Sequence, residues 1–104
     1  MLHGMTRPGI AIPLEQITDL CRRHHIRRLS LFGSVLREDF RPESDVDVLV
    51  EFEPGRTPGF GFFGIQQELS ELLGRPVDLN TPGFLSDYFR DEVLREAEVL
   101  YVAA

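Results

Sequence analysis

The spacing of hydrophobic residues changes several times along the chain, and each change predicts a secondary-structure element. Apolar residues recur at steps of three and four from Pro13 to about His25, which predicts an amphipathic helix. Apolar and polar residues alternate across 45–52, which predicts a strand with three valines on one face and Asp45, Asp47 and Leu49 on the other. The remaining predicted elements are a strand at 26–32, a helical turn at 34–39, helices at 62–73 and 84–96, and strands at 76–79 and 99–102.

The order of these elements predicts an α/β or α+β fold, in which a small mixed β-sheet has helices packed on it. Residues 1–12 are expected to form a flexible N-terminus, and residues 13–104 a single domain, because no linker or repeat divides them. The residues of the last helix that are expected to face the core are Leu85, Tyr88, Phe89, Val93 and Leu94.

Composition limits the classes of function. The chain has 104 residues and a formal net charge of -6, and all of its Lys and Arg residues are arginines. An acidic chain is not expected to bind DNA directly through its phosphates. No apolar run is long enough to span a bilayer, and the first residues lack a signal-peptide pattern, so a cytoplasmic location is expected. The single cysteine, Cys21, is expected to be a small buried residue rather than a reactive thiol.

Asp45 and Asp47 are the first candidate site residues. Residues two apart on a strand lie on the same face, roughly 6–7 Å apart along the chain, so their carboxylates can converge on a divalent cation. Magnesium prefers oxygen ligands and usually keeps substrate phosphates in its shell. The alternative is an exposed sheet face that carries two solvated acids.

A Gly33-Ser34 pair precedes this strand and strengthens the metal-site interpretation. Glycine allows a phosphate to approach the backbone closely, and the Ser34 hydroxyl can add a hydrogen bond. Ten residues separate Ser34 from Asp45, which is enough for a helical turn and a loop that returns to an adjacent strand. A plain strand-to-helix turn is the alternative for this pair.

Asp78 is a third candidate, because it lies between Val77 and Leu79 on a short predicted strand. A carboxylate flanked by apolar residues is costly to bury without a partner. If its strand neighbours that of Asp45, Asp78 completes a three-carboxylate site in which it ligates a metal or accepts a proton. Otherwise it is an edge-strand acid that faces water.

Together, Gly33-Ser34, Arg37, the segment 44–50 and the segment 76–79 resemble the minimal nucleotidyltransferases (MNT) of the DNA polymerase β superfamily. The resemblance implies that fold, ATP as substrate and two Mg²⁺ ions. Members are commonly the antitoxin of a pair whose toxin is a HEPN-domain ribonuclease, and the implied activity is AMP transfer to a tyrosine of that toxin. The resemblance assigns nucleotide binding to Gly33, Ser34 and Arg37, and catalysis and metal binding to Asp45, Asp47 and Asp78.

Two features depart from the family pattern. Glu38 stands where relatives often have glycine after the arginine, and Val35-Leu36 is bulkier than the small residues often found there. Glu38 places a negative charge near a site that must hold a triphosphate. These departures put turnover and nucleotide fit in question rather than the fold.

Other functions stay open on the sequence. A non-catalytic antitoxin of the same fold would neutralise its toxin by complex formation alone, and a small-molecule nucleotidyltransferase would need a substrate domain for which this chain has no room. The apolar segment 58–63 either contacts a partner or caps the core. Arg56 either folds over a triphosphate or is a solvated loop residue. The arginines at 22, 23, 27 and 28 either are solvated or form a docking patch for an acidic partner or phosphates.

Overall fold

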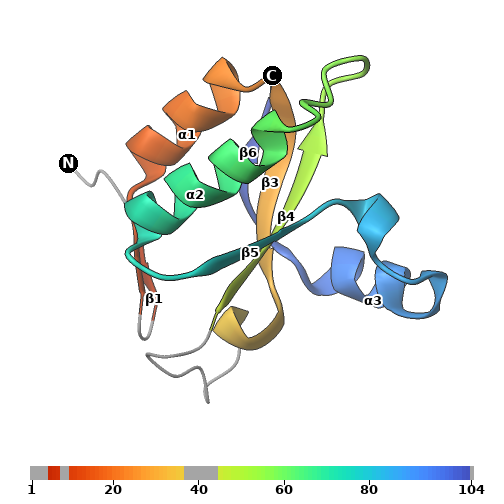
Figure 1. Cartoon of the computed structure of the whole chain (residues 1–104). Helices are drawn as coiled ribbons and strands as arrows, with labels where there is room; N and C mark the ends of the chain where they lie inside the picture. The colour runs from red at the N-terminus through yellow and green to blue at the C-terminus, as the bar shows by residue number, and fades with distance from the viewer. Residues whose placement is uncertain (1–4, 8–9, 37–44, 104) are drawn as a thin grey trace.

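The structure is a computed structural model, and it describes residues 5–7, 10–36 and 45–103. Its main feature is a four-stranded sheet with helices on one face (Figure 1). In chain order, the elements are β1 (Met5–Arg7), β2 (Ile10–Ile12), α1 (Leu14–Arg23), β3 (Ile26–Phe32), the 3-10 turn η1 (Gly33–Leu36), β4 (Val46–Phe52), α2 (Gly61–Leu73), β5 (Val77–Asn80), the 3-10 turn η2 (Pro82–Phe84), α3 (Asp87–Glu96) and β6 (Glu98–Val102).

The sheet is mixed, as the sequence predicted. Its strand order is β5-β4-β3-β6; β4 and β5 are parallel, and the other two pairs are antiparallel. Helix α2 connects β4 to β5, because parallel neighbours need a crossover. This topology places the beginnings of β4 and β5 at the same end of the sheet, next to the turn that follows β3.

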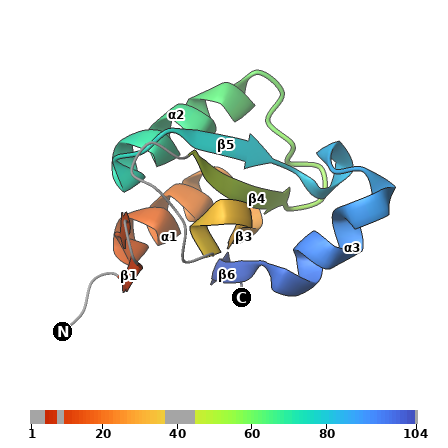
Figure 2. The ribbon, with the colours of Figure 1, turned by 90° about the horizontal axis from the view of Figure 1, so that it is seen from below.

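The core lies between the sheet and helices α1 and α2, which run side by side over one face (Figures 1 and 2). Val46, Val48 and Val50 are buried there, so the predicted valine face is confirmed. Cys21 is buried in the same cluster, and this burial raises the pKa of its thiol to about 12, as expected for an unreactive core residue. No helix in the described part of the chain is long and apolar enough to cross a membrane.

The chain before α1 contains two short strands that the sequence analysis did not predict. β1 and β2 pair antiparallel, with Met5 opposite Ile12. Ile12 is 1% exposed and belongs to the core cluster. Strands of three residues are too short to show an alternating pattern, which explains why they were missed.

The segment 82–96 differs from the single helix predicted over 84–96. Leu85 and Ser86 are extended, with ψ angles of 142° and 148°, and they separate η2 from α3. The break moves the following residues out of the phase that the pattern assumed. Leu85 is buried as predicted, but Tyr88 is 96% exposed and Leu94 is 40% exposed, so the inward orientation predicted for these two residues is wrong.

Replacing Tyr88 with alanine tests this correction. Because the side chain is almost fully exposed, Tyr88→Ala is expected to change the free energy of unfolding by less than about 0.5 kcal/mol. Leu85→Ala, which truncates a buried side chain, is expected to cost clearly more. Urea unfolding of both variants is the measurement, and a larger loss for Tyr88→Ala than for Leu85→Ala would contradict the structure.

An ion-pair cluster joins the two core helices at their exposed sides. Arg23 of α1 donates to Glu68 of α2 and, through Nε, to Asp19 at 3.0 Å, while His24 Nε2 lies 3.3 Å from Glu68 Oε1. The hydrogen bond from Arg23 lowers the pKa of the Glu68 carboxyl below its ordinary value of 4.5; burial opposes this shift, and His24 adds to it. The cluster therefore contributes stability in the charged form of Glu68.

A pH titration of stability tests the cluster. Glu68→Gln is expected to be less stable than the wild type at neutral pH. The difference is fully present above about pH 4.5, the ordinary pKa of a glutamate, and is lost as the pH falls through the lower pKa of the folded state. Thermal melts from pH 7 to pH 3 measure it, with Glu71→Gln on the same helix as the control. A difference that grows on acidification would show that Glu68 is not stabilised as a carboxylate.

Candidate functional site

Gly33 and Asp47 meet at the end of the sheet where β3 ends and β4 begins. Phe32 pairs with Asp47 in the antiparallel register of β3 and β4, so the next residue, Gly33, turns the chain beside the aspartate. A Cβ atom built on Gly33 would lie 2.2 Å from Asp47 Oδ2, and Gly33 has a φ of +74°. Both the contact and the left-handed backbone require glycine. The structure therefore brings together the first phosphate-binding candidate and one of the paired acids.

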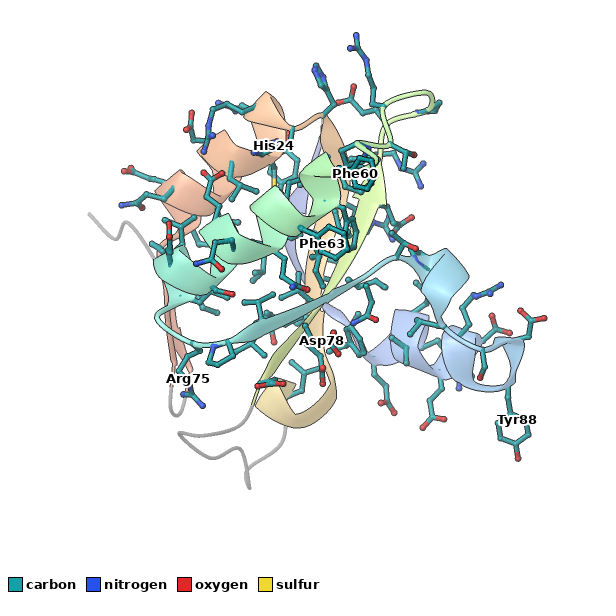
Figure 3. The ribbon with its side chains drawn as sticks, viewed as in Figure 1. His24, Phe60, Phe63, Arg75, Asp78 and Tyr88 are labelled. Atoms are coloured by element: carbon teal, nitrogen blue, oxygen red, sulfur yellow. The ribbon has the colours of Figure 1, made fainter. Side chains whose placement is uncertain are left out.

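Asp78 lies next to Asp47 on the adjacent strand. The parallel register of β4 and β5 pairs Asp47 with Asp78, so both side chains project from the sheet face opposite the core helices. Neighbouring strands are about 4.8 Å apart, and like charges at this spacing are unfavourable unless a cation or solvent offsets them. Asp78 is exposed and Asp47 is partly buried (Figure 3 labels Asp78). The two strands are neighbours, so the condition on which the three-carboxylate interpretation depended is met.

Asp45 immediately precedes β4 and is exposed. Being two residues from Asp47, it belongs to the same side of the chain, roughly 6–7 Å further along. The three acids predicted from sequence thus lie at the beginnings of two adjacent strands, and we call Asp45, Asp47 and Asp78 the acidic site. Of the remaining predicted residues, Ser34 follows Gly33 in η1, and Arg37, like the divergent Glu38, lies outside the described residues.

The donor set suits a hard cation when nucleotide phosphates complete its shell. Among residues 5–7, 10–36 and 45–103, no three His, Cys, Asp or Glu side chains gather closely enough to hold a metal by themselves. Mg²⁺, however, is usually bound by one or two carboxylates together with substrate phosphates rather than by an all-protein cage. Asp45, Asp47 and Asp78 offer oxygen ligands of this kind, and the absence of a side chain at Gly33 leaves room for the Asp47 carboxylate.

Two residues that the sequence analysis did not select hold β5 in place. The Leu79 amide donates to Gln66 Oε1 at 3.0 Å, and the Val77 amide donates to Ser70 Oγ at 3.1 Å. Both partners come from α2, which runs alongside β5 (Figure 2). Their spacing of four residues places two polar side chains on one side of the helix, but this spacing alone does not indicate that they face a strand.

The other candidates lie away from the acids. Arg56 is exposed in the loop that follows β4, and seven strand residues separate this loop from Asp45, so the structure does not bring Arg56 to the acidic site. In the segment 58–63, Phe62 packs at 6.5 Å from the ring of Phe52, whereas Phe60 and Phe63 are 94% and 67% exposed (Figure 3). Phe62 and Phe63 line an apolar hollow of about 330 Å³ with Thr57, Pro58, Gly59 and Thr81.

Comparison with known proteins agrees with this geometry. Residues 14–100 match the family described as "Nucleotidyltransferase domain". Protein adenylyltransferase MntA of Thermococcus cleftensis is 38% identical over 85 residues, which cover 81% of this chain and 82% of the relative. A solved structure described as a minimal nucleotidyltransferase is 42% identical, with a TM-score of 0.68, and the match covers 81% of this chain and 85% of that chain.

A more distant likeness extends the comparison of folds. A chain from the solved complex of a tri-AMPylated Shewanella oneidensis HEPN toxin with MNT antitoxin has a TM-score of 0.61 at 21% identity, and the match covers 86% of this chain and 70% of that chain. At this identity the likeness concerns the fold alone. The family match spans most of the chain and includes all three residues of the acidic site, so this chain belongs to the nucleotidyltransferase domain family.

Proposed function

We propose that this chain transfers AMP from ATP to a tyrosine hydroxyl of a HEPN ribonuclease toxin and acts as its antitoxin. The observation that carries the proposal is the close approach of the Asp47 carboxylate to Gly33, at the end of the sheet where Asp47 also pairs with Asp78. The named activity of the Thermococcus cleftensis relative and the AMPylated toxin in the Shewanella oneidensis complex support the choice of donor and acceptor.

In the proposed site, Asp45, Asp47 and Asp78 would hold the cation, and Gly33 and Ser34 would receive the phosphates at the turn that follows β3. Bound Mg²⁺ would neutralise charge on the phosphates and stabilise the leaving pyrophosphate. Because Gly33 has no side chain, the Asp47 carboxylate can lie directly against the turn that would receive the phosphates. The carboxylates supply position and charge, which account for most of the rate enhancement in reactions of this type.

In the proposed reaction, the acceptor oxygen attacks the α-phosphorus of ATP. The bond between that oxygen and phosphorus forms, the bond from phosphorus to the bridging oxygen breaks, and pyrophosphate leaves. Asp78 takes the hydroxyl proton, a role that suits an exposed carboxylate beside Asp47. Because Asp45 and Asp78 are exposed, a side chain on the surface of another protein can reach the acidic site.

Intact-mass spectrometry of the partner tests the proposal. A HEPN protein, sought in the reading frame next to the gene for this chain, is incubated with the full chain, ATP and Mg²⁺, and is expected to gain one or more AMP groups. No mass gain is expected when ATP is omitted or when the chain carries both Asp45→Asn and Asp47→Asn.

The same samples separate catalysis from simple binding. A non-catalytic antitoxin would form the complex and block the ribonuclease without ATP, and its double Asn variant would neutralise the toxin fully. Ribonuclease assays on the unmodified and the modified partner therefore distinguish the two functions. Full neutralisation without any mass gain would replace the enzymatic proposal with the binding one.

A further inference from the structure

β5 is an edge strand of four residues, and both of its edges are hydrogen-bonded. One edge pairs with β4 in the parallel register. On the other edge, side chains take the place of a neighbouring strand: Ser70 Oγ accepts from Val77, and Gln66 Oε1 accepts from Leu79. Ser70 Oγ also donates to the backbone carbonyl oxygen of Gln66 at 2.9 Å, one helical turn earlier, and this bond fixes the orientation of the Ser70 hydroxyl.

Asp78 lies between the two amides that α2 holds. Backbone groups of successive strand residues point to opposite edges, so the neighbours of Asp78 face α2 while Asp78 itself faces β4. A strand of four residues at the edge of a sheet would open more easily without such contacts. The contacts from α2 therefore restrain the residues on both sides of a carboxylate whose own side chain is exposed.

We infer that Gln66 and Ser70 are positioning residues, which hold β5 so that the Asp78 carboxylate stays opposite Asp47 when metal and nucleotide bind. The inference rests on the proposed function. The competing explanation is that the two side chains only satisfy the amides of an exposed edge and so prevent unwanted strand pairing. The two explanations differ in whether a change at Gln66 acts through Asp78.

The first experiment measures metal binding rather than activity. Mn²⁺ affinity is determined by electron paramagnetic resonance on the full chain with α,β-methylene-ATP, and circular dichroism confirms folding. Gln66→Leu, which removes the acceptor at similar size, is expected to weaken Mn²⁺ binding about tenfold, as one misplaced ligand would. Gln66→Glu keeps an oxygen acceptor, so its Mn²⁺ affinity is expected to be close to that of the wild type.

Gln67→Leu is the matched control. Gln67 is the next residue on the same helix, is exposed and donates to Glu71 at 3.4 Å rather than to β5. It is expected to bind Mn²⁺ like the wild type. Ser70→Ala is the milder second variant, and it is expected to weaken binding in the same direction if Gln66→Leu does not fold.

A double-mutant cycle decides between positioning and a merely structural role. Gln66→Leu is expected to lower Mn²⁺ affinity and the kcat of AMP transfer in the wild type, with the KM for acceptor unchanged. In an Asp78→Asn background it is expected to have no further effect beyond about twofold. Equal losses in both backgrounds, or wild-type affinity in Gln66→Leu, would overturn the inference.

The failures are distinguishable. If the wild type modifies its partner but Asp78→Asn behaves like the wild type in both assays, the positioning inference and the role proposed for Asp78 are wrong, and the proposed AMP transfer stands. If the wild type neither modifies its partner nor binds Mn²⁺ with the analogue, the proposed function fails as well.

Discussion

Asp47→Asn is expected to lower the rate of AMP transfer about 1000-fold, or about 4 kcal/mol in the activation free energy, and to leave the fold intact. The Asp47 carboxylate lies against Gly33 and opposite Asp78, where a phosphate-bound cation would need its charge. Asparagine has nearly the same shape but no charge, so the packing at the start of β4 is kept while the ligand is lost. The measurement is the single-turnover rate at saturating ATP.

Asp87→Asn is the control for this prediction. Asp87 is an exposed acid in the first turn of α3 and pairs with Arg90 at 3.0 Å. The same chemical change there is expected to leave the transfer rate within twofold of the wild type. An Asp47→Asn variant that keeps more than a tenth of the wild-type rate, with an unchanged melting temperature, would rule out Asp47 as a metal ligand.

Gly33→Ala is expected to reduce AMP transfer about 100-fold and stability by about 1–3 kcal/mol. Two effects combine at this position. The φ of +74° strains any residue with a Cβ atom, and the new methyl group would lie 2.2 Å from Asp47 Oδ2. The carboxylate must move to relieve this contact, so the loss of activity follows from its displacement.

Gly55→Ala separates the two effects. Gly55 has a nearly identical φ of +77°, but a Cβ atom there meets nothing within 4 Å. It is therefore expected to show the backbone strain alone, with a smaller loss of stability in urea unfolding than Gly33→Ala and with wild-type transfer activity. Equal activity in the two variants would mean that the Gly33–Asp47 contact has no catalytic role.

The strands of the acidic site could be predicted from sequence because their patterns are strong. Alternation across 45–52 is regular, and all three valines lie in the core. The pairing of Asp47 with Asp78 was a conditional prediction, because alternation orients a strand's faces but does not select its neighbour. The contact of Gly33 with Asp47 depends on register and was not visible as a contact in the sequence.

The wrong predictions and the features that were missed have physical causes as well. Leu85, Tyr88 and Leu94 fit one helical pattern only if the helix is continuous, and two extended residues break it. Ile12 is a core residue in a strand too short to show a period. Gln66 and Ser70 looked like ordinary polar residues of an amphipathic helix, because an acceptor for a strand amide cannot be recognised until that strand is placed beside it.

The most direct test of nucleotidyl transfer at the acidic site uses ATP labelled at different phosphates. The partner is incubated with the full chain, Mg²⁺ and ATP carrying ³²P at either the α or the γ position. We expect the partner to retain the α label and not the γ label, and to retain neither with the Asp45→Asn, Asp47→Asn double variant. Retention of the γ label, or α labelling by the double variant, would contradict the proposed reaction or its site.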